Sequence, residues 1–369
     1  MAERTTRYLG LDVHKATIAV AVAEQSGAPS LFGTIANEPG EVRKLCARVG
    51  RNARLVAAYE AGPTGYDLHR QLVSLGVEAV VVAPSLTPTR PGDRVKTDNR
   101  DALSLARLLR SGDLTPIWVP DREHEALRDL VRAREDAKAT LMRERHHLSK
   151  FLLRQGMHAP GRVSWGQQHH RWLNQVQFPI AAHQLVFADY LGAERAAEER
   201  VRRLERAIHE CVEGSSLLPL VAALECLRGI AFLSASIVAV EVGDFRRFSS
   251  APQFMAYTGL VPSEHSSGAS RRRGHITHTG NAQLRHVLVQ AAHNARYRPS
   301  QEGTLRKRLE GAPPDLVHLS FSAQQRLHNR YWHLQRRLGT AKAVTAVARE
   351  LAGFVWAVGQ RMTEVPVAA

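Results

Sequence analysis

The order of strand and helix patterns in the first 111 residues is the feature that most constrains the fold of this chain. Two apolar, β-branched runs at 8–13 and 16–27 predict a hairpin that turns near His14 and Lys15. Further strands are predicted at 31–37, 54–62 and 77–84, and helices at 38–49, 66–75 and 98–109. The resulting order, β-β-β-α-β-α-β-α, joins an antiparallel start to parallel crossovers.

This order is typical of ribonuclease H-like folds, and it predicts an α/β domain over residues 1–121. Residues 122–155 and 183–213 instead repeat leucine, valine and alanine at near-heptad spacing. They predict two long helices in a central region, 122–215, which form either a coiled coil or an internally packed helical hairpin. The third predicted domain, 216–369, is mainly helical.

Several local patterns organise the predicted C-terminal domain. Residues 227–250 resemble a helix-hairpin-helix element, whose glycine-containing turn would present backbone N–H groups to phosphate. A loop is expected over 259–281 and a helix over 282–295. The amphipathic segment 341–362 is expected to dock on this domain as a tail helix.

The charge balance indicates the class of partner. The chain of 369 residues carries 50 Lys and Arg against 35 Asp and Glu, a net charge of +15. Such a balance favours a nucleic acid partner, although basic residues can also serve solubility alone. Three scattered cysteines exclude a disulfide framework and a structural zinc site of the usual cysteine spacing. The eighteen histidines show no metal-binding spacing either, and surface or interface positions are expected for them.

Location is predicted from what the sequence lacks. The first residues have no apolar core of a signal peptide, and no run of 18 apolar residues occurs. We therefore expect a reduced protein in the cytoplasm with no membrane segment.

Four acidic residues are predicted to meet at one edge of the first domain. Asp12 and Glu60 end strands that should be neighbours, and Asp98 and Asp101 open a helix on one face. Converging carboxylates repel one another unless divalent cations neutralise them, and hard oxygen ligands suit Mg²⁺ or Mn²⁺. A two-metal site of this kind catalyses phosphoryl transfer. The alternative is that Asp98 only caps its helix and that Asp101 only lies in the first turn, where the helix dipole favours anions.

Four motifs together resemble a known family. They are GLDVHK, YEAGPTGY, KTDNRDALSLARLL and FMAYTGLVPSEHSSG with RGHITHTGNAQLR. The chain is similar to the DEDD-type transposases of the insertion sequence 110 family, which includes the 1111 subgroup and is related to Piv DNA invertases. The resemblance implies a RuvC-like domain whose acidic tetrad is Asp12, Glu60, Asp98 and Asp101.

The resemblance also implies a nucleophilic serine within Ser266-Ser267-Gly268. We favour Ser267, because the following glycine permits a tight turn, and keep Ser266 as the alternative. In the family the acidic site and this serine act together on a DNA phosphate, and a covalent phosphoserine link conserves the phosphodiester energy. A flexible turn without function is the competing interpretation of the segment.

The resemblance and the basic charge together predict the partners. These are donor and target DNA, a guide RNA encoded by the element, and further copies of the chain in a dimer or tetramer. The residues expected to bind nucleic acid are Lys15, Lys96, Arg271, Arg272, Arg273 and Arg285. Lys15 and its neighbour His14 could equally be plain turn residues, and the arginine run a solvated face.

Three other functions compete with a recombinase. A metal-dependent Holliday-junction nuclease would use water in place of the serine. An actin-like kinase also begins with a G-x-D hairpin, but this chain has His14 and Lys15 where such kinases hold phosphate with Gly and Thr. A non-catalytic nucleic-acid scaffold would not require acids at strand ends.

Overall fold

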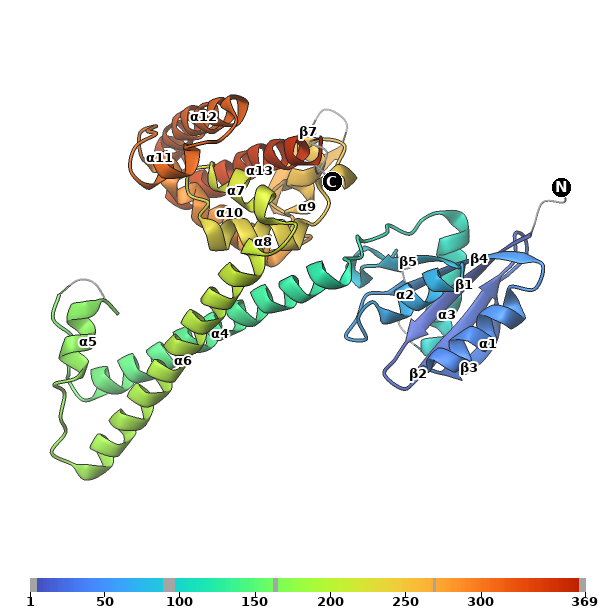
Figure 1. Ribbon diagram of the computed structural model, residues 1–369, viewed down its shortest axis with the longest axis horizontal. Coiled ribbons are helices and arrows are strands. Elements are labelled where there is room, and N and C mark those ends of the chain that lie inside the picture. Colours follow the sequence, from blue (N-terminus) through green and yellow to red (C-terminus); the bar gives the residue numbers. More distant parts are fainter. Residues whose placement is uncertain (1–4, 89–96, 162–164, 268–269, 365–369) are drawn as a thin grey trace. The chain divides into compact units, whose positions relative to one another are not determined.

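The computed structural model describes residues 5–88, 97–161, 165–267 and 270–364, without the side chains of 265–267, 270–273 and 363–364. The chain forms two compact units, Met1–Val119 and Pro120–Ala369 (Figure 1). The first unit is an α/β structure and the second is almost wholly helical.

One mixed sheet organises the first unit. Its strands are β1 (Thr5–Val13), β2 (Thr17–Ala23), β3 (Ser30–Ala36), β4 (Ala53–Glu60) and β5 (Glu78–Val82). The spatial order is β3-β2-β1-β4-β5, with β1 antiparallel to β2 and parallel to β4. The predicted hairpin followed by parallel crossovers is therefore confirmed, and the mixed sheet is consistent with the predicted ribonuclease H-like domain.

Helices cover both faces of this sheet. They are α1 (Pro39–Val49), α2 (Asp67–Ser74) and α3 (Asp98–Ser111), with a short 3₁₀ turn, η1, at Pro84–Leu86. Because side chains alternate along a strand, Leu9 and Leu11 point to the face that packs against α1 and α2. The opposite face contacts α3 through small residues, Ala19, Ala21 and Ala23 against Ala102 and Ala106. Small side chains on both partners let α3 lie close to the sheet.

Gly10 sets how closely α3 approaches β1. A Cβ atom at Gly10 would lie 2.1 Å from the Ala102 carbonyl oxygen and 2.4 Å from the Ala106 nitrogen. Both are backbone atoms, so any larger residue would push the helix away from the strand. The glycine in the YLGLDV strand therefore determines where the start of α3 lies.

The second unit begins with a long helical hairpin. Helices α4 (Arg122–Arg154) and α6 (Ala181–Glu213) pack against each other, and the short helix α5 (Gln167–Leu173) lies in the segment that joins them. Ion pairs from Arg134 to Glu205 and from Arg145 to Glu194 show that the two helices run antiparallel. The expected pair of long helices is confirmed, and coiled-coil geometry stays a prediction.

Helices also form most of the remainder of the second unit. They are α7 (Leu218–Glu225), α8 (Phe232–Val242), α9 (Ala251–Tyr257), α10 (Ala282–Ala292), α11 (Thr304–Leu309), α12 (Pro314–Leu338) and α13 (Thr340–Glu364), with 3₁₀ turns η2 (Phe245–Arg247) and η3 (His293–Arg296). Every residue of α8 from Ala235 to Val242 is buried, and α13 contributes buried residues from Ala343 to Val358 to the same core. The predicted docking of the tail helix is confirmed.

The loop expected over 259–281 is wrong in its central part. Strands β6 (Pro262–Ser267) and β7 (Ser270–Ile276) form an antiparallel ribbon in which Ser266 pairs with Arg271 and Ser267 with Ser270. Serine, histidine, glutamate and arginine fill these strands, so the apolar alternation that marks a half-buried strand is missing. Gly268 was the available sequence signal, because glycine is common in hairpin turns.

Helices α7 and α8 flank the turn at which a helix-hairpin-helix element is predicted. Gly229 in this turn has a φ of +90°, and a Cβ atom there would lie 2.6 Å from the Ala291 carbonyl oxygen. The turn therefore packs tightly against α10, while phosphate binding by it stays a prediction. None of the helices in the described residues is alone long and apolar enough to cross a membrane, and only the pair α6–α7, bent by 112°, passes by length and composition.

Candidate active site

Two strand ends place carboxylates at the same edge of the sheet. In the parallel pair β1–β4, Leu11 lies opposite Tyr59, so the next residues in register are Asp12 and Glu60. Both follow a residue that points into the core with α1 and α2, and their own side chains therefore belong to the face covered by α3. The predicted pairing of these two strands is confirmed, and both carboxylates are half-buried.

The start of α3 brings the other two acids to this face. Asp98 is the first residue of the helix and Asp101 lies in its first turn. Thr97 is the residue that precedes the helix, and its side chain makes no capping hydrogen bond. Asp98 is therefore not the helix cap, which removes the first part of the alternative interpretation. The close contact at Gly10 fixes this end of α3 relative to β1.

His14 lies between Asp12 and Asp98. Its Nε2 atom is 3.3 Å from Asp12 Oδ2 and 3.5 Å from Asp98 Oδ2, and the three potential ligand atoms lie within 4.8 Å of one another. The backbone N–H of His14 donates to the Thr17 carbonyl at 2.8 Å, which closes the predicted turn. The sequence predicted the turn, but the contact with Asp98 depends on the packing of α3.

The electrostatics of this cluster favour a bound cation. Burial, the largest influence, raises the pKa of Asp12, and the carboxylates of Asp98 and Asp101 raise it as well, while His14 lowers it. Within the described part of the chain, the ion pairs of Asp12 and Asp98 are those with His14. A carboxylate whose neighbours raise its pKa is stabilised in its ionised form when a cation binds nearby.

Three other residues predicted to act in this unit do not belong to the cluster of Asp12, His14 and Asp98. Glu60 lies at the same sheet edge, but it is not among the three residues whose ligand atoms lie within 4.8 Å. Lys15 is exposed in the hairpin turn. Lys96 lies outside the described residues.

The candidate serines lie at the end of a strand in the second unit. Ser266 and Ser267 are the last two residues of β6, and Arg271, Arg272 and Arg273 belong to β7; the side chains of all five lie outside the described part of the structure. At the base of the ribbon, Arg285 Nη1 donates to the carbonyls of Thr258, at 3.0 Å, and Thr279, at 3.4 Å. Arg285 thus joins the two segments that flank the ribbon, and its contact with nucleic acid stays a prediction.

Known proteins resemble both units. Residues 9–156 match the DEDD transposase model of the IS110 type, and residues 221–306 match the model of the transposase IS116/IS110/IS902 family. A putative transposase, y4qE, of Sinorhizobium fredii is 43% identical over 98% of this chain and 90% of its own length. The transposase for insertion sequence element IS1533 of Leptospira borgpetersenii is 32% identical over 89% and 96%. The chain belongs to the IS110 family of transposases.

A buried carboxylate also holds the serine-bearing part of the transposase in place. Glu241, on α8, is 3% exposed and accepts from Arg132 Nε and Nη2 of α4 at 2.9 and 3.0 Å. It also accepts from the side chain of Asn281, which caps α10 at Leu284 N (2.9 Å) just after the ribbon. The carboxylate thus joins the long hairpin to the base of the ribbon. Glu241 within the apolar run SIVAVEV was the sequence signal for this contact, since an acid in such a run needs a partner.

The expectation of surface or interface histidines differs from the structure at His124 and His169, which are 7% and 6% exposed. Nε2 of His124 lies 2.9 Å from the Val240 carbonyl oxygen. Their positions on packed helix faces, rather than any spacing of histidines, decide their burial.

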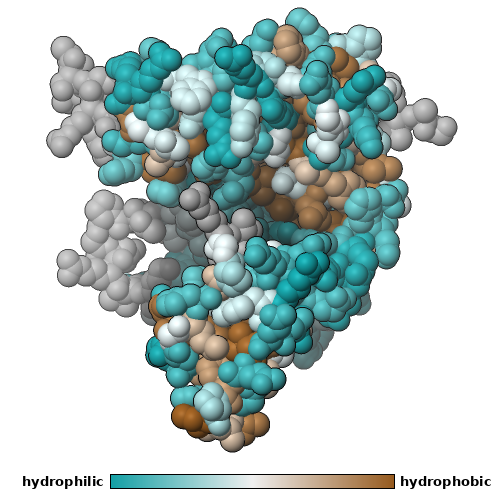
Figure 2. Space-filling view, turned by 90° about the vertical axis from the view of Figure 1, so that its left-hand side faces the viewer, coloured by the Kyte–Doolittle hydropathy of each residue, from teal (hydrophilic) through white to brown (hydrophobic). Residues whose placement is uncertain are grey.

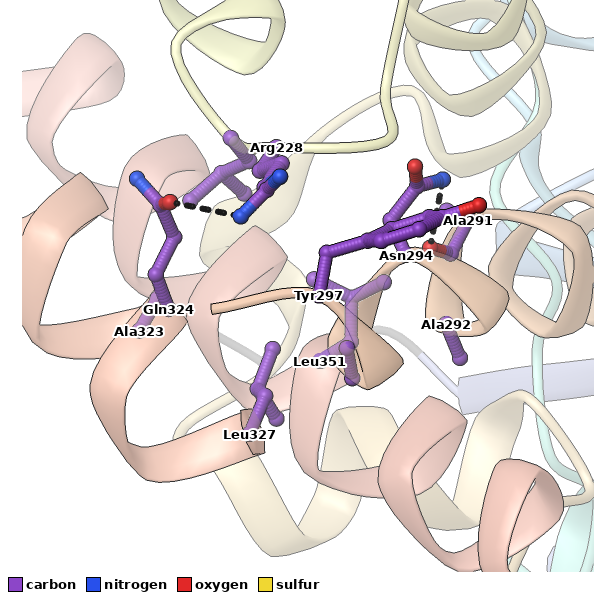
Figure 3. Close-up of a pocket in the computed structure, with 11 residues that line it drawn as sticks. Arg228, Ala291, Ala292, Asn294, Tyr297, Ala323, Gln324, Leu327 and Leu351 are labelled. Carbon is purple, nitrogen blue, oxygen red and sulfur yellow. Dashed lines mark hydrogen bonds between the residues drawn. The ribbon is translucent and has the colours of Figure 1, made fainter. Parts of the chain in front are cut away.

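The pocket drawn in Figure 3 is not a substrate site. It lies among Arg228, Asn294, Tyr297 and Gln324, with Leu327 and Leu351 below, and its volume is about 20 Å³. Arg228 Nη1 donates to Gln324 Oε1 across it at 3.4 Å. A space of this size holds about one water molecule. The acidic edge of the first unit therefore remains the candidate site for chemistry.

Proposed function

We propose that this transposase cuts and rejoins DNA at insertion-sequence ends with a metal-binding acidic tetrad and a serine nucleophile. The observation that carries the proposal is the meeting of Asp12, His14 and Asp98 at the sheet edge, with the pKa of Asp12 raised by burial and by the charges of Asp98 and Asp101. Such a cluster costs folding energy without a cation, and sites that perturb pKa in this way are commonly functional.

Asp12, Glu60, Asp98 and Asp101 would hold Mg²⁺ or Mn²⁺. Their oxygen atoms are the hard ligands that these ions prefer, and the half-exposed His14 can turn away from the carboxylates. When bound, the ions stabilise negative charge on the attacking and leaving oxygens of a phosphate. The carboxylates themselves orient the ions, and His14 offers a donor to a phosphate oxygen that enters the site.

In our proposal Ser267 attacks the DNA. Its Oγ atom forms a bond to phosphorus, the hydroxyl proton leaves to a base, and the bond from phosphorus to one sugar oxygen breaks. The phosphoserine ester retains the energy of the broken phosphodiester, so that a second strand can be joined without ATP. Ser266, one residue earlier on β6, is the alternative nucleophile.

Basic residues near both groups support the nucleic acid partners. The ribbon places Arg271, Arg272 and Arg273 in β7, the strand that pairs with the serines, and Lys15 is the exposed neighbour of His14 in the hairpin turn. Lys96 and Arg285 are further candidates for phosphate contacts. The net charge of +15 is compatible with the simultaneous binding of DNA and an element-encoded guide RNA.

The end of the α4–α6 hairpin supports a homo-oligomer, either a dimer or a tetramer. Leu185, Ile180 and Leu153 are 73%, 56% and 52% exposed there. Figure 2 shows apolar, brown residues at the lower end of the view, the height at which the hairpin ends in Figure 1. Apolar residues gathered at one exposed end are typical of a protein–protein contact.

Covalent trapping tests the proposal. Wild-type protein incubated with end-labelled insertion-sequence DNA and Mg²⁺ should give a protein–DNA adduct that survives a denaturing gel, with the linked peptide containing Ser267. Ser267→Ala should bind DNA but lose the adduct, and Ser266→Ala is the matched control. An adduct on Ser266 would correct the residue. Cleavage by Ser267→Ala and Ser266→Ala without any adduct would instead indicate the Holliday-junction type of nuclease, in which water attacks.

A further inference from the structure

A second cluster of metal-ligand side chains lies in the helical hairpin of the second unit. His170 on α5 and Glu194 and Glu198 on α6 place one potential ligand atom each within 4.8 Å of one another. The two glutamates are one helical turn apart, so they share a face of α6. These residues belong to different elements of the same unit, and packing alone brings them together.

Glu194 is the feature that needs explaining. Its side chain is fully buried, and Oε1 accepts from Arg145 Nε at 2.9 Å. Within the described residues, Oε2 is buried and has no hydrogen-bond partner. A buried carboxylate oxygen without a donor or cation has lost its contacts with water and gained nothing in their place. This oxygen is therefore the place at which a ligand would gain most.

We propose that His170, Glu194 and Glu198 bind a divalent transition-metal ion of the zinc type. One imidazole and two carboxylates form a donor set that zinc accepts, with water completing four-coordination. The imidazole disfavours Mg²⁺, which prefers oxygen ligands. The ligand set thus differs from the all-carboxylate tetrad that we propose for the first unit.

Arg145 fits an outer position around such an ion. It donates to Oε1 of Glu194 and, through Nη2 at 3.0 Å, to Oε1 of Glu198, which orients both carboxylates. Ligating carboxylates in metal sites are commonly held in this way. Oε2 of Glu194 remains free for the ion, while Oε2 of Glu198 is 3.2 Å from Arg202, an exposed partner that is displaced at little cost.

Aromatic packing positions the imidazole. The Arg145 guanidinium lies over the Trp165 ring at 4.8 Å, and Trp165 also packs against His169 and His170. An ion held by His170 and the α6 glutamates would join α5 to α6. The ion would thereby fix the connector between the two long helices. The exposed apolar residues Leu153, Ile180 and Leu185 lie at the same end of the hairpin.

Metal binding to the full-length protein tests this site. Because His14 with Asp12 and Asp98 could also take zinc, the experiment uses the Asp12→Ala, His14→Ala double variant as its background. Metal-free protein of this background should bind one Zn²⁺ per chain in a calorimetric titration, and Co²⁺ should give a visible absorption band. Adding His170→Ala or Glu194→Gln should weaken Zn²⁺ binding by about 100-fold or more, on the scale of lost metal-site contacts.

His147→Ala is the matched control, because His147 forms an exposed pair with Glu144 on the same hairpin. It should leave Zn²⁺ affinity unchanged. If His170→Ala or Glu194→Gln fails to fold, X-ray absorption of the Co²⁺-loaded background protein decides, with one nitrogen ligand among oxygens expected. Absence of Zn²⁺ binding, or binding that His170→Ala leaves unchanged, would overturn the proposal.

Discussion

Acidic side chains in the two units have opposite surroundings. In the second unit, Glu241 is buried and accepts hydrogen bonds from Arg132. In the first unit, Asp12 and Asp98 share an exposed histidine as their ion-pair partner within the described residues. The first arrangement stabilises the fold, and the second leaves negative charge available to an incoming cation.

This difference separates structural from functional carboxylates in a single chain. A buried acid with an arginine is neutralised inside the protein and holds two elements together. A carboxylate whose pKa is raised by burial and by neighbouring acids, as that of Asp12 is, is maintained at a cost, which a metal-dependent reaction would explain. Variants that remove one kind of carboxylate contact at a time separate the two roles.

The largest effect is expected on DNA rejoining. Asp12→Ala or Asp98→Ala should reduce recombination in a plasmid assay by about 100-fold or more, because each removes a ligand of the proposed metal site. Both variants should fold, since Asp12 lies one residue before the end of β1, Asp98 begins α3, and neither fills the core. Glu41→Ala, which removes an acid paired with Lys44 on α1, is the control and should retain activity. Full activity of Asp12→Ala would remove the cluster from the mechanism.

The second effect concerns the structural acids. Arg132→Met should destabilise the second unit by about 2–4 kcal/mol, because it leaves the buried Glu241 with Asn281 as its remaining side-chain donor in the described residues. Arg206→Met removes an exposed pair with Glu199 and should cost about 1 kcal/mol or less. Urea denaturation of the two variants measures both values. Equal losses of stability in the two variants would mean that burial of Glu241 does not increase the cost of removing its arginine partner.

A smaller effect is expected on pH dependence. Burial between α4 and α8 lowers the pKa of His124, so the folded state favours the neutral ring. The stability from this group is present above the unfolded pKa of about 6.5 and is lost as the pH falls below it. The free energy of unfolding should therefore drop between about pH 7 and pH 5, by less than about 1.4 kcal/mol per pH unit for this one group. His124→Gln should flatten that slope, and an unchanged slope would assign it to other groups.

The sequence predicts the acidic site well because its parts are local. A hydrophobic run that ends in Asp12 or Glu60, and a helix that opens with Asp98 and Asp101, are visible along the chain. Strand order then follows from the few topologies that connect such elements. The contact of His14 with Asp98 is not local, because it depends on Gly10 and the approach of α3.

The β6–β7 ribbon and the polar contacts of the second unit show where sequence reasoning stops. Polar strands lack the alternation of apolar and polar residues that indicates a strand, so the sequence around Ser267 predicts a loop. The contacts of Glu241 with Arg132 and of Glu194 with Arg145 join residues 109 and 49 positions apart. No spacing rule relates partners that are so far apart in the sequence. Their burial depends on how the helices pack in three dimensions.

The most direct test of the account is the effect of Mg²⁺ on the stability of wild-type protein and Asp12→Asn. Because the pKa of Asp12 is raised, its ionised form opposes folding at neutral pH, and this penalty grows as the pH rises from the usual pKa of an aspartate. Without divalent cations, Asp12→Asn should therefore have a higher Tm than wild type. Mg²⁺ should raise the Tm of wild type, since ligands that bind the folded state stabilise it, and should leave that of Asp12→Asn nearly unchanged. A variant that is less stable than wild type without Mg²⁺, and that gains as much from Mg²⁺, would contradict a cation site at Asp12.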